Sequence, residues 1–255
     1  MNKRKQNLIE RYFNNPKKDD QKRRKMEDST KNFPFDNDQK QNNWSHISGP
    51  QLNLSTLNLY PSFERRRHIF SELETQISYL RDHSLTTIKV FGKTHNLPRK
   101  HAAYGDDGVT YTYSGIKIPA TSWEQAPILK KVLEDIKYVT DINYNFVLIN
   151  RYQNGQDKMG EHKDDERELD PCVPIASLSF GQERDFVFRH QNLVKKSGTI
   201  KHSDKSELIK KLILKDGMLL LMNSPTNQFW YHSLPQRSTK VCPGVRINLT
   251  FRKIV

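Results

Sequence analysis

The sequence predicts a mainly β fold with flanking helices, and two observations support this class. After Asn143 the chain changes to short β-rich runs separated by turn residues. These runs are FVLINRY, IASLSF, DFVFRH, MLLLM and RINLTFR. Before that point, two stretches repeat apolar residues at helical spacing, with charged residues on the other side. We therefore expect a β core in the C-terminal half of the chain, braced by helices.

The two predicted helices cover residues 62–83 and 122–140. The apolar stripe of the first contains Ile69, Phe70, Leu73, Ile77 and Leu80, and that of the second contains Ile128, Leu129, Val132, Leu133 and Ile136. A one-sided stripe of this kind is typical of a helix that packs on a sheet. We expect both helices to support the fold rather than to carry function.

Residues 1–45 are rich in Lys, Asn, Asp and Gln and lack a sustained apolar period. This composition predicts a disordered basic tail, because it cannot bury enough apolar surface to offset the loss of chain entropy. Residues 46–255 are then long enough to form a single domain with a substantial core. No apolar run reaches the roughly 18 residues that cross a bilayer, so we expect no membrane association.

The net charge of +13 indicates a polyanionic partner such as nucleic acid. Residues 1–31 hold 11 Lys and Arg against 5 Asp and Glu, so about half of the excess belongs to the predicted domain. A basic surface kept for solubility is the alternative. Cys172 and Cys242 belong to no C-x-x-C pattern, so neither a disulfide framework nor a thiolate zinc site is expected, which fits a reducing compartment.

A candidate metal site consists of His162-Lys163-Asp164 and the later His232. Two imidazoles and one carboxylate can occupy one face of a ferrous ion and leave the opposite positions open. Residues i and i+2 of a strand point to the same side, so His162 and Asp164 on one strand can bind one ion together. An isolated H-x-D motif arises by chance, and the argument therefore depends on the ordered set.

A second motif supports this interpretation. In RINLTFR the even-numbered residues share one face of a strand, which places Arg246, Asn248, Thr250 and Arg252 together. Guanidinium groups bind carboxylates in a bidentate fork, so this face fits a dicarboxylate. A zinc hydrolase could use the same three metal ligands, but it has no need for the arginine pair and no general base is apparent.

With these motifs the sequence resembles the AlkB family of Fe(II)/2-oxoglutarate dioxygenases, particularly its animal members that repair alkylated duplex DNA. The resemblance rests on NFVLINRY (145–152), GEHKDDERELDP (160–171), PIASLSFGQERDFVFRH (174–190), SPTNQFWYHSLP (224–235) and RINLTFRKI (246–254). It implies a double-stranded β-helix, or jelly-roll, core and a reaction that uses Fe(II), 2-oxoglutarate and dioxygen. It also implies that Asn150, Tyr152, Arg246, Thr250 and Arg252 bind 2-oxoglutarate.

The implied reaction is oxidative demethylation of 1-methyladenine and 3-methylcytosine in mainly duplex DNA, with release of formaldehyde, succinate and carbon dioxide. Methylation at the pairing nitrogen makes the base cationic, so anionic groups are expected near the iron. Asp165 and Glu166 follow the metal aspartate directly, and by resemblance they contact the base. We expect at least one of them to contact the base; the alternative is that one is solvated or pairs with Arg167, because adjacent strand residues face opposite sides.

The resemblance also implies a nucleotide-recognition lid at about 89–120. Its base-contacting residues are Tyr111, Thr112 and Tyr113, and its intercalating hairpin finger carries Phe91, Gly92 and Lys93. Aromatic walls replace the stacking that an extruded base loses, and a wedge fills the gap in the duplex. The lysine-rich stretch 195–211 and the stretch 236–245 differ in detail from the family, which leaves strand preference less determined than catalysis.

Three other functions remain open. The protein could demethylate single-stranded DNA or RNA, or hydroxylate a protein side chain, although the basic charge argues against the latter. A hypothesis of another class is a non-catalytic DNA-binding adaptor, but this requires an incomplete metal or co-substrate set.

The tail contains Gln6-x-x-Ile9-x-x-Tyr12-Phe13, which resembles the box that docks repair proteins on the sliding clamp PCNA. A short helical turn would direct Ile9 and the aromatic pair into an apolar pocket. The cluster KKDDQKRRK (17–25) reads as a nuclear localisation signal. A fortuitous match and a mitochondrial targeting segment are the alternatives. We expect a nuclear monomer that binds PCNA.

Overall fold

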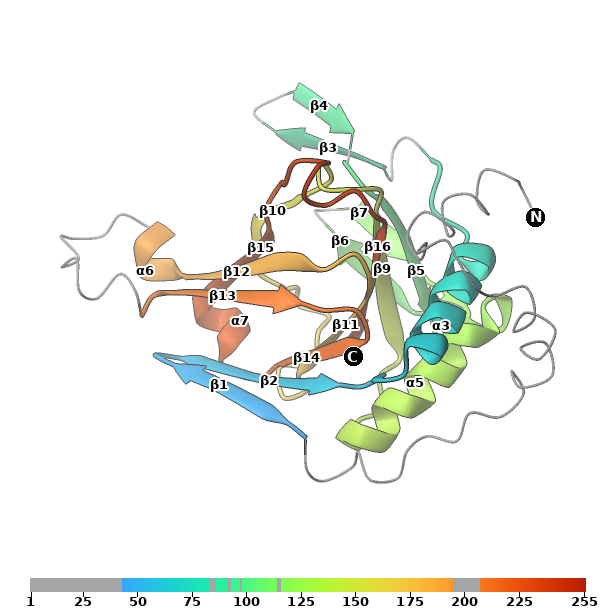
Figure 1. Ribbon diagram of the computed structural model, residues 1–255, viewed down its shortest axis with the longest axis horizontal. Coiled ribbons are helices and arrows are strands. Elements are labelled where there is room, and N and C mark those ends of the chain that lie inside the picture. Colours follow the sequence, from blue (N-terminus) through green and yellow to red (C-terminus); the bar gives the residue numbers. More distant parts are fainter. Residues whose placement is uncertain (1–42, 83–85, 91–92, 97, 114–115, 195–206) are drawn as a thin grey trace, which may run out of the picture.

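The computed structural model describes residues 43–255 except 83–85, 91–92, 97, 114–115 and 195–206 (Figure 1). Residues 1–42 of the predicted tail, with the predicted clamp-binding and nuclear motifs, therefore lie outside the described residues, and Ser45 begins the first strand. The described chain is mainly β, as predicted, and its helices lie at the periphery of two sheets. No helix in the described residues is both long enough and apolar enough to cross a membrane.

An eight-stranded sheet forms the larger layer. Its order is β1 (Ser45–Gly49), β2 (Leu52–Asn58), β14 (Met218–Met222), β11 (Ile175–Gly181), β16 (Arg246–Arg252), β9 (Phe146–Tyr152), β5 (Lys100–Gly105) and β8 (Thr121–Ser122). All neighbours are antiparallel except β5 and β8. The central strands β9, β11 and β16 are buried along their whole length, so each of their two faces is covered.

A four-stranded sheet forms the smaller layer. Its order is β10 (Met159–His162), β15 (Trp230–Leu234), β12 (Arg184–His190) and β13 (Ile209–Leu214). The two layers bury a shared apolar cluster that includes Leu54, Phe186, Phe188, Leu220 and Trp230. Two antiparallel sheets that face each other across a core in this way form the predicted jelly-roll.

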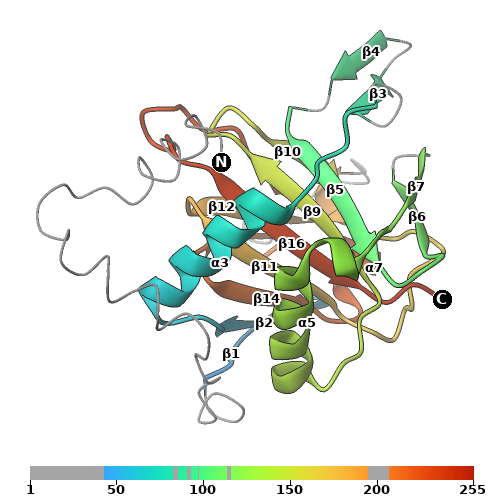
Figure 2. The same ribbon diagram turned by 90° about the vertical axis from the view of Figure 1, so that its right-hand side faces the viewer.

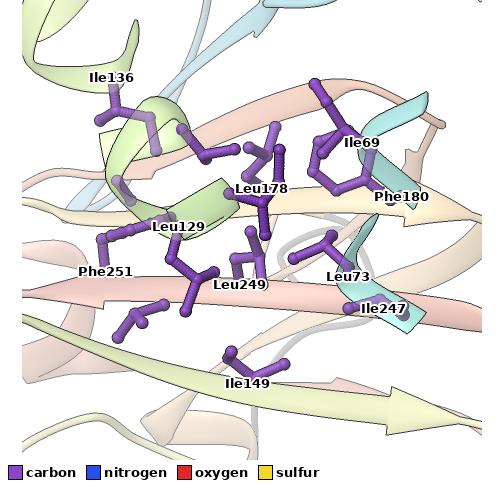
Figure 3. Close-up of a cluster of buried hydrophobic side chains, with 14 of the residues drawn as sticks. Ile69, Leu73, Leu129, Ile136, Ile149, Leu178, Phe180, Ile247, Leu249 and Phe251 are labelled. Carbon is purple, nitrogen blue, oxygen red and sulfur yellow. The ribbon is translucent and has the colours of Figure 1, made fainter. Parts of the chain in front are cut away.

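Helices α3 (Phe63–Gln76) and α5 (Pro127–Thr140) cover the outer face of the large sheet (Figure 2). Figure 3 shows Leu73 and Leu129 of these helices against Leu178, Ile247 and Leu249 of the sheet. Side chains of β11 and β16 therefore alternate between this outer core and the space between the sheets. That alternation turns Ser177, Ser179 and the even-numbered residues of β16 toward the smaller sheet.

The predicted helices are longer than the observed ones. The first ends at Gln76 because the Ser78 amide donates to the Tyr104 hydroxyl at 3.0 Å and Ile77 is extended. Ile77 is nevertheless buried. The second begins only at Pro127, which suits the first turn of a helix because it has no amide hydrogen to leave unbonded. The preceding residues form β8 and a short 3-10 helix, η2 (Trp123–Gln125).

Two hairpins and two short helices complete the fold. The hairpin of β3 (Thr87–Val90) and β4 (Lys93–Asn96) projects away from the sheets (Figure 1). The second hairpin pairs β6 (Thr110–Tyr113) with β7 (Ile116–Pro119). Helices α6 (Gln191–Val194) and α7 (Thr226–Phe229) lie beside the small sheet.

Candidate metal and co-substrate site

The three predicted metal ligands converge between the sheets. His162 ends β10 and lies opposite His232 of β15, with the two ring centroids 4.2 Å apart. The Asp164 carboxylate lies 3.8 Å from the Nε2 atom of each histidine. All candidate ligand atoms lie within 4.8 Å of one another, which suits three ligands of one ion.

The prediction that His162 and Asp164 lie on one strand was wrong. Strand β10 ends at His162, so Asp164 lies in an irregular segment and strand alternation does not place it. A contact with β16 places it instead: the Nη2 atom of Arg252 lies 3.1 Å from Asp164 Oδ1. The carboxylate is thus held by a guanidinium almost 90 residues later in the chain.

The protonation states of the ligands favour metal binding. Burial alone would raise the pKa of Asp164, but Arg252, His232 and His162 outweigh it and lower the pKa to about 2. Burial, assisted by His162, lowers the pKa of His232 to about 3. The Nδ1 atom of His162 donates to the Gly160 carbonyl at 3.0 Å, which leaves Nε2 as the ligand atom. The Asp164 carboxylate and the neutral imidazole of His232 are therefore available near neutral pH.

Arg246 is a buried cation for which the described residues supply no acidic partner. Its Nη2 atom donates to the Ser179 hydroxyl at 2.9 Å, and its guanidinium lies 5.3 Å from the Tyr152 ring centroid. Among the described residues no ion pair includes Arg246, and its Nε atom has no hydrogen-bond partner. Burial lowers the pKa of Arg246 to about 10. A buried guanidinium in these surroundings is suited to bind an anionic ligand.

All five predicted co-substrate residues line one cavity together with the three metal ligands. The face of β16 is arranged as alternation predicts, with Arg246, Asn248, Thr250 and Arg252 on the cavity side. Asn248 donates to the Ser177 hydroxyl at 2.9 Å and its Oδ1 accepts from Thr250 at 3.2 Å. These polar side chains are thereby fixed in position beside the metal site.

The two arginines of β16 differ. Arg252 already has the Asp164 carboxylate as a partner and lies 5.0 Å from the Tyr111 ring centroid. Burial would lower its pKa, but Asp164, Tyr111 and Glu166 outweigh burial and raise it. Arg246 is therefore the better candidate for the 2-oxoglutarate carboxylate, whereas Arg252 holds the metal aspartate.

A second cavity adjoins the first at Asp164 and Met222. Its acidic wall contains Asp165, Glu166 and Asp170, and its other residues include Leu169, Val173, Ile175, Pro225 and Asn227. Both Asp165 and Glu166 line this cavity, with Asp165 exposed and Glu166 half-buried, and strand alternation does not apply to them because the segment after His162 is not a strand. Burial raises the pKa of Glu166, although the nearby Arg252 lowers it and so opposes part of this shift.

The predicted lid residues occupy different positions. Tyr111 is fully buried, with its ring 5.0 Å from the Phe146 ring, and it does not line the acidic cavity. In this conformation Tyr111 therefore has no exposed surface with which it could make the predicted contact with a base. The Thr112 hydroxyl binds Glu168 and lowers the pKa of that carboxyl. The side chain of Tyr113 lies outside the described residues.

The predicted finger coincides with the β3–β4 hairpin, in which Val90 pairs with Lys93. Phe91 and Gly92, which follow Val90 in the sequence, lie outside the described residues, as does the side chain of Lys93.

The sequence prediction missed several residues of the site. Buried Arg99 donates to Asn150 Oδ1 at 2.8 Å, and Ser179 binds Arg246. Ser177 and Ser179 alternate with apolar residues in IASLSF, a pattern that marks the polar side of this strand. Arg99 has no comparable signal, because it precedes β5 and only the fold brings it to β9.

Comparisons with known proteins agree with this geometry. The family model of the 2OG-Fe(II) oxygenase superfamily matches residues 53–252. The protein named DNA oxidative demethylase ALKBH2 is 47% identical over 212 residues in both Bos taurus and Homo sapiens. The match spans 83% of this chain and 72% and 77% of those chains, respectively. The Arabidopsis thaliana protein of the same name is 35% identical over 76% of this chain and 63% of its own.

The solved structure of OsALKBH1 aligns with 82% of this chain and 99% of that chain, at a TM-score of 0.49 and 17% sequence identity. The matched family model includes every residue of the triad. The predicted cofactors, Fe(II), 2-oxoglutarate and dioxygen, are thereby confirmed. The chain belongs to the 2OG-Fe(II) oxygenase superfamily and, within it, to the AlkB family of Fe(II)/2-oxoglutarate dioxygenases.

Proposed function

We propose that this protein is a DNA repair enzyme that oxidatively demethylates 1-methyladenine and 3-methylcytosine, mainly in duplex DNA. The observation that carries this proposal is the acidic cavity beside the metal triad, which shares Asp164 with it. A base methylated at its pairing nitrogen is cationic, so carboxylates beside the iron would favour it over an unmodified base. Relatives named DNA oxidative demethylase, at 45–47% identity, support DNA as the substrate.

The residues present fit the groups that this reaction needs. His162, Asp164 and His232 would hold Fe(II), and Arg246 would bind a carboxylate of 2-oxoglutarate. When bound, the iron would supply the oxidative chemistry, in which dioxygen would oxidise 2-oxoglutarate to succinate and carbon dioxide and hydroxylate the N-methyl group. The hydroxymethyl adduct then breaks down to formaldehyde and the normal base.

The protein's own groups orient these reactants. Arg252 holds the Asp164 carboxylate ionised and in place. The buried cavity around Arg246 separates the co-substrate from bulk water, which strengthens its charge-assisted contacts. Asp165 and Glu166 would accept hydrogen bonds from the cationic base or balance its charge. The net charge of +13 supports attraction to the phosphate backbone.

The test is demethylation of an oligonucleotide carrying a single 1-methyladenine, supplied as a duplex and as the matched single strand. Fe(II), 2-oxoglutarate and ascorbate are added, and formaldehyde and the repaired base are measured by mass spectrometry. Faster repair of the duplex supports the proposal. Faster repair of the single strand, or of the same lesion in RNA, would favour the single-strand alternative, and no repair of either would reject DNA demethylation.

We also propose that the N-terminal tail docks on PCNA in the nucleus through Gln6, Ile9, Tyr12 and Phe13. The motif spacing and the basic cluster at 17–25 support this proposal. Replacement of Tyr12 and Phe13 by Ala should eliminate PCNA binding in calorimetry and leave repair of a short duplex unchanged. A wild-type tail peptide with no affinity for PCNA would reject clamp docking. Size-exclusion chromatography with light scattering tests the expected monomer.

A further inference from the structure

We propose that Lys163 is a positioning residue of the metal centre, which fastens the segment carrying His162 and Asp164 to the segment carrying His232. This inference concerns how the metal is held and goes beyond the proposed demethylation. It starts from the contacts of Lys163, whose ammonium group binds the Gln228 carbonyl of α7 at 2.6 Å and the Gln191 side chain of α6 at 3.2 Å. The same group lies 4.9 Å from the Tyr231 ring centroid.

The backbone alone holds this part of the site weakly. Strand β10 pairs with β15 only at Met159 and His162, and the register shifts between these two residues. After His162 the chain leaves the sheet, so no strand ladder fixes Lys163 or Asp164. Side-chain contacts must therefore determine where Asp164 and the rest of the segment after His162 lie relative to β15.

Lys163 supplies such a contact on the side away from the metal. It does not line the cavity that contains the three ligands, so it is no ligand itself. Its two neighbours along the chain are ligands, and its partners Gln228 and Tyr231 precede His232 by four residues and one residue. A single ammonium group thus connects both ligand-bearing segments through a short charge-assisted hydrogen bond and a ring contact.

Two effects of Lys163 on metal affinity have opposite signs. A cation near the site repels a divalent ion, so electrostatics alone predicts tighter metal binding after its removal. Loss of positioning predicts weaker metal binding, because part of the binding free energy is then used to order the ligands. Removing groups that orient metal ligands typically costs 10- to 100-fold in affinity. We expect positioning to prevail in Lys163→Met, with about a 10-fold loss.

The experiment measures Mn(II) affinity of the full chain without DNA, from the electron paramagnetic resonance signal of free Mn(II). Lys163→Met should bind Mn(II) about 10-fold more weakly than wild type, and Lys163→Arg, which keeps a cationic donor, should remain within about 3-fold. The matched control is Lys137→Met, which removes the same charge from the exposed face of α5. Circular dichroism and thermal unfolding of the metal-free variants establish that they fold.

Unchanged or tighter Mn(II) binding by Lys163→Met would overturn the proposal, as would an equal loss in Lys163→Arg. If Lys163→Met does not fold, Lys163→Gln replaces it, because the shorter, uncharged glutamine loses the charge-assisted bond to Gln228 and the cation contact with Tyr231, and an unchanged affinity there also overturns the proposal. The Mn(II) titration contains no DNA, so its outcome does not depend on whether the protein demethylates DNA. Failure of the demethylation assay would therefore reject the proposed function without affecting the test of Lys163.

Discussion

Replacing Arg246 by Met separates ligand binding from stability, since this guanidinium is buried without an acidic partner. Each hydrogen bond to a charged group contributes about 1.5–3 kcal/mol, and 1.36 kcal/mol corresponds to a tenfold change in affinity. Loss of one such bond to 2-oxoglutarate should therefore weaken its binding roughly 10- to 150-fold. Methionine retains much of the side-chain volume, so packing changes little.

The same substitution should leave the free protein as stable as the wild type or more stable. Desolvation of a buried ion costs several kcal/mol, whereas the contacts with Ser179 and Tyr152 return only about 1–2 kcal/mol each. The matched control is Arg151→Met. Arg151 is also buried, but it forms a 2.6 Å ion pair with Glu74 of α3. Its removal should destabilise the protein by about 3–5 kcal/mol because a carboxylate loses its partner.

The assay combines calorimetric titration of 2-oxoglutarate into the Mn(II)-loaded protein with urea unfolding of the ligand-free protein. Arg246→Met should show weakened 2-oxoglutarate binding and an unfolding free energy at or above that of the wild type. A 2-oxoglutarate affinity within about 2-fold of wild type would refute the assignment of Arg246 to the co-substrate. A loss of stability as large as that of Arg151→Met would refute the view that Arg246 is an uncompensated buried cation.

Three further predictions concern catalysis, substrate form and pH. Asp164→Ala should abolish demethylation and leave duplex affinity, measured by fluorescence anisotropy, largely unchanged, because the basic surface supplies most of the binding; near wild-type activity would contradict the metal assignment. Phe91→Ala should reduce repair of duplex DNA more than repair of single strands, since only a duplex needs its gap filled; equal losses would argue against an intercalating finger. Burial, assisted by Lys163, lowers the pKa of His190, so the unfolded state takes up the proton first as pH falls below about 6.5. The stability contributed by neutral His190 is therefore present above this pH and is lost below it. The unfolding free energy of His190→Gln should decline less from pH 7 to pH 5 than that of the wild type, and parallel curves would reject this.

The sequence by itself determined the class of fold and the chemistry of the site. Alternation in RINLTFR correctly placed Arg246, Asn248, Thr250 and Arg252 on one face, because side-chain direction in a strand depends only on local backbone geometry. The same local rule does not apply to Asp164 and Asp165, which lie beyond the end of β10. Apolar periodicity likewise located α3 and α5, but it predicted that α3 continues past Gln76. The helix ends there, and the Ser78 amide donates to the Tyr104 hydroxyl of β5.

Only the tertiary structure decided which partner each charged group has. The sequence presents Arg246 and Arg252 as equivalent, six residues apart on one strand face. Among the residues that the structure describes, the fold brings Asp164 to Arg252 but hydroxyl groups and a ring to Arg246, so one guanidinium orients a metal ligand and the other is available to an anion. Lys163 shows the same dependence, since its partners lie 28 and 65 residues away. Burial and long-range pairing set these roles, and neither is encoded in local spacing.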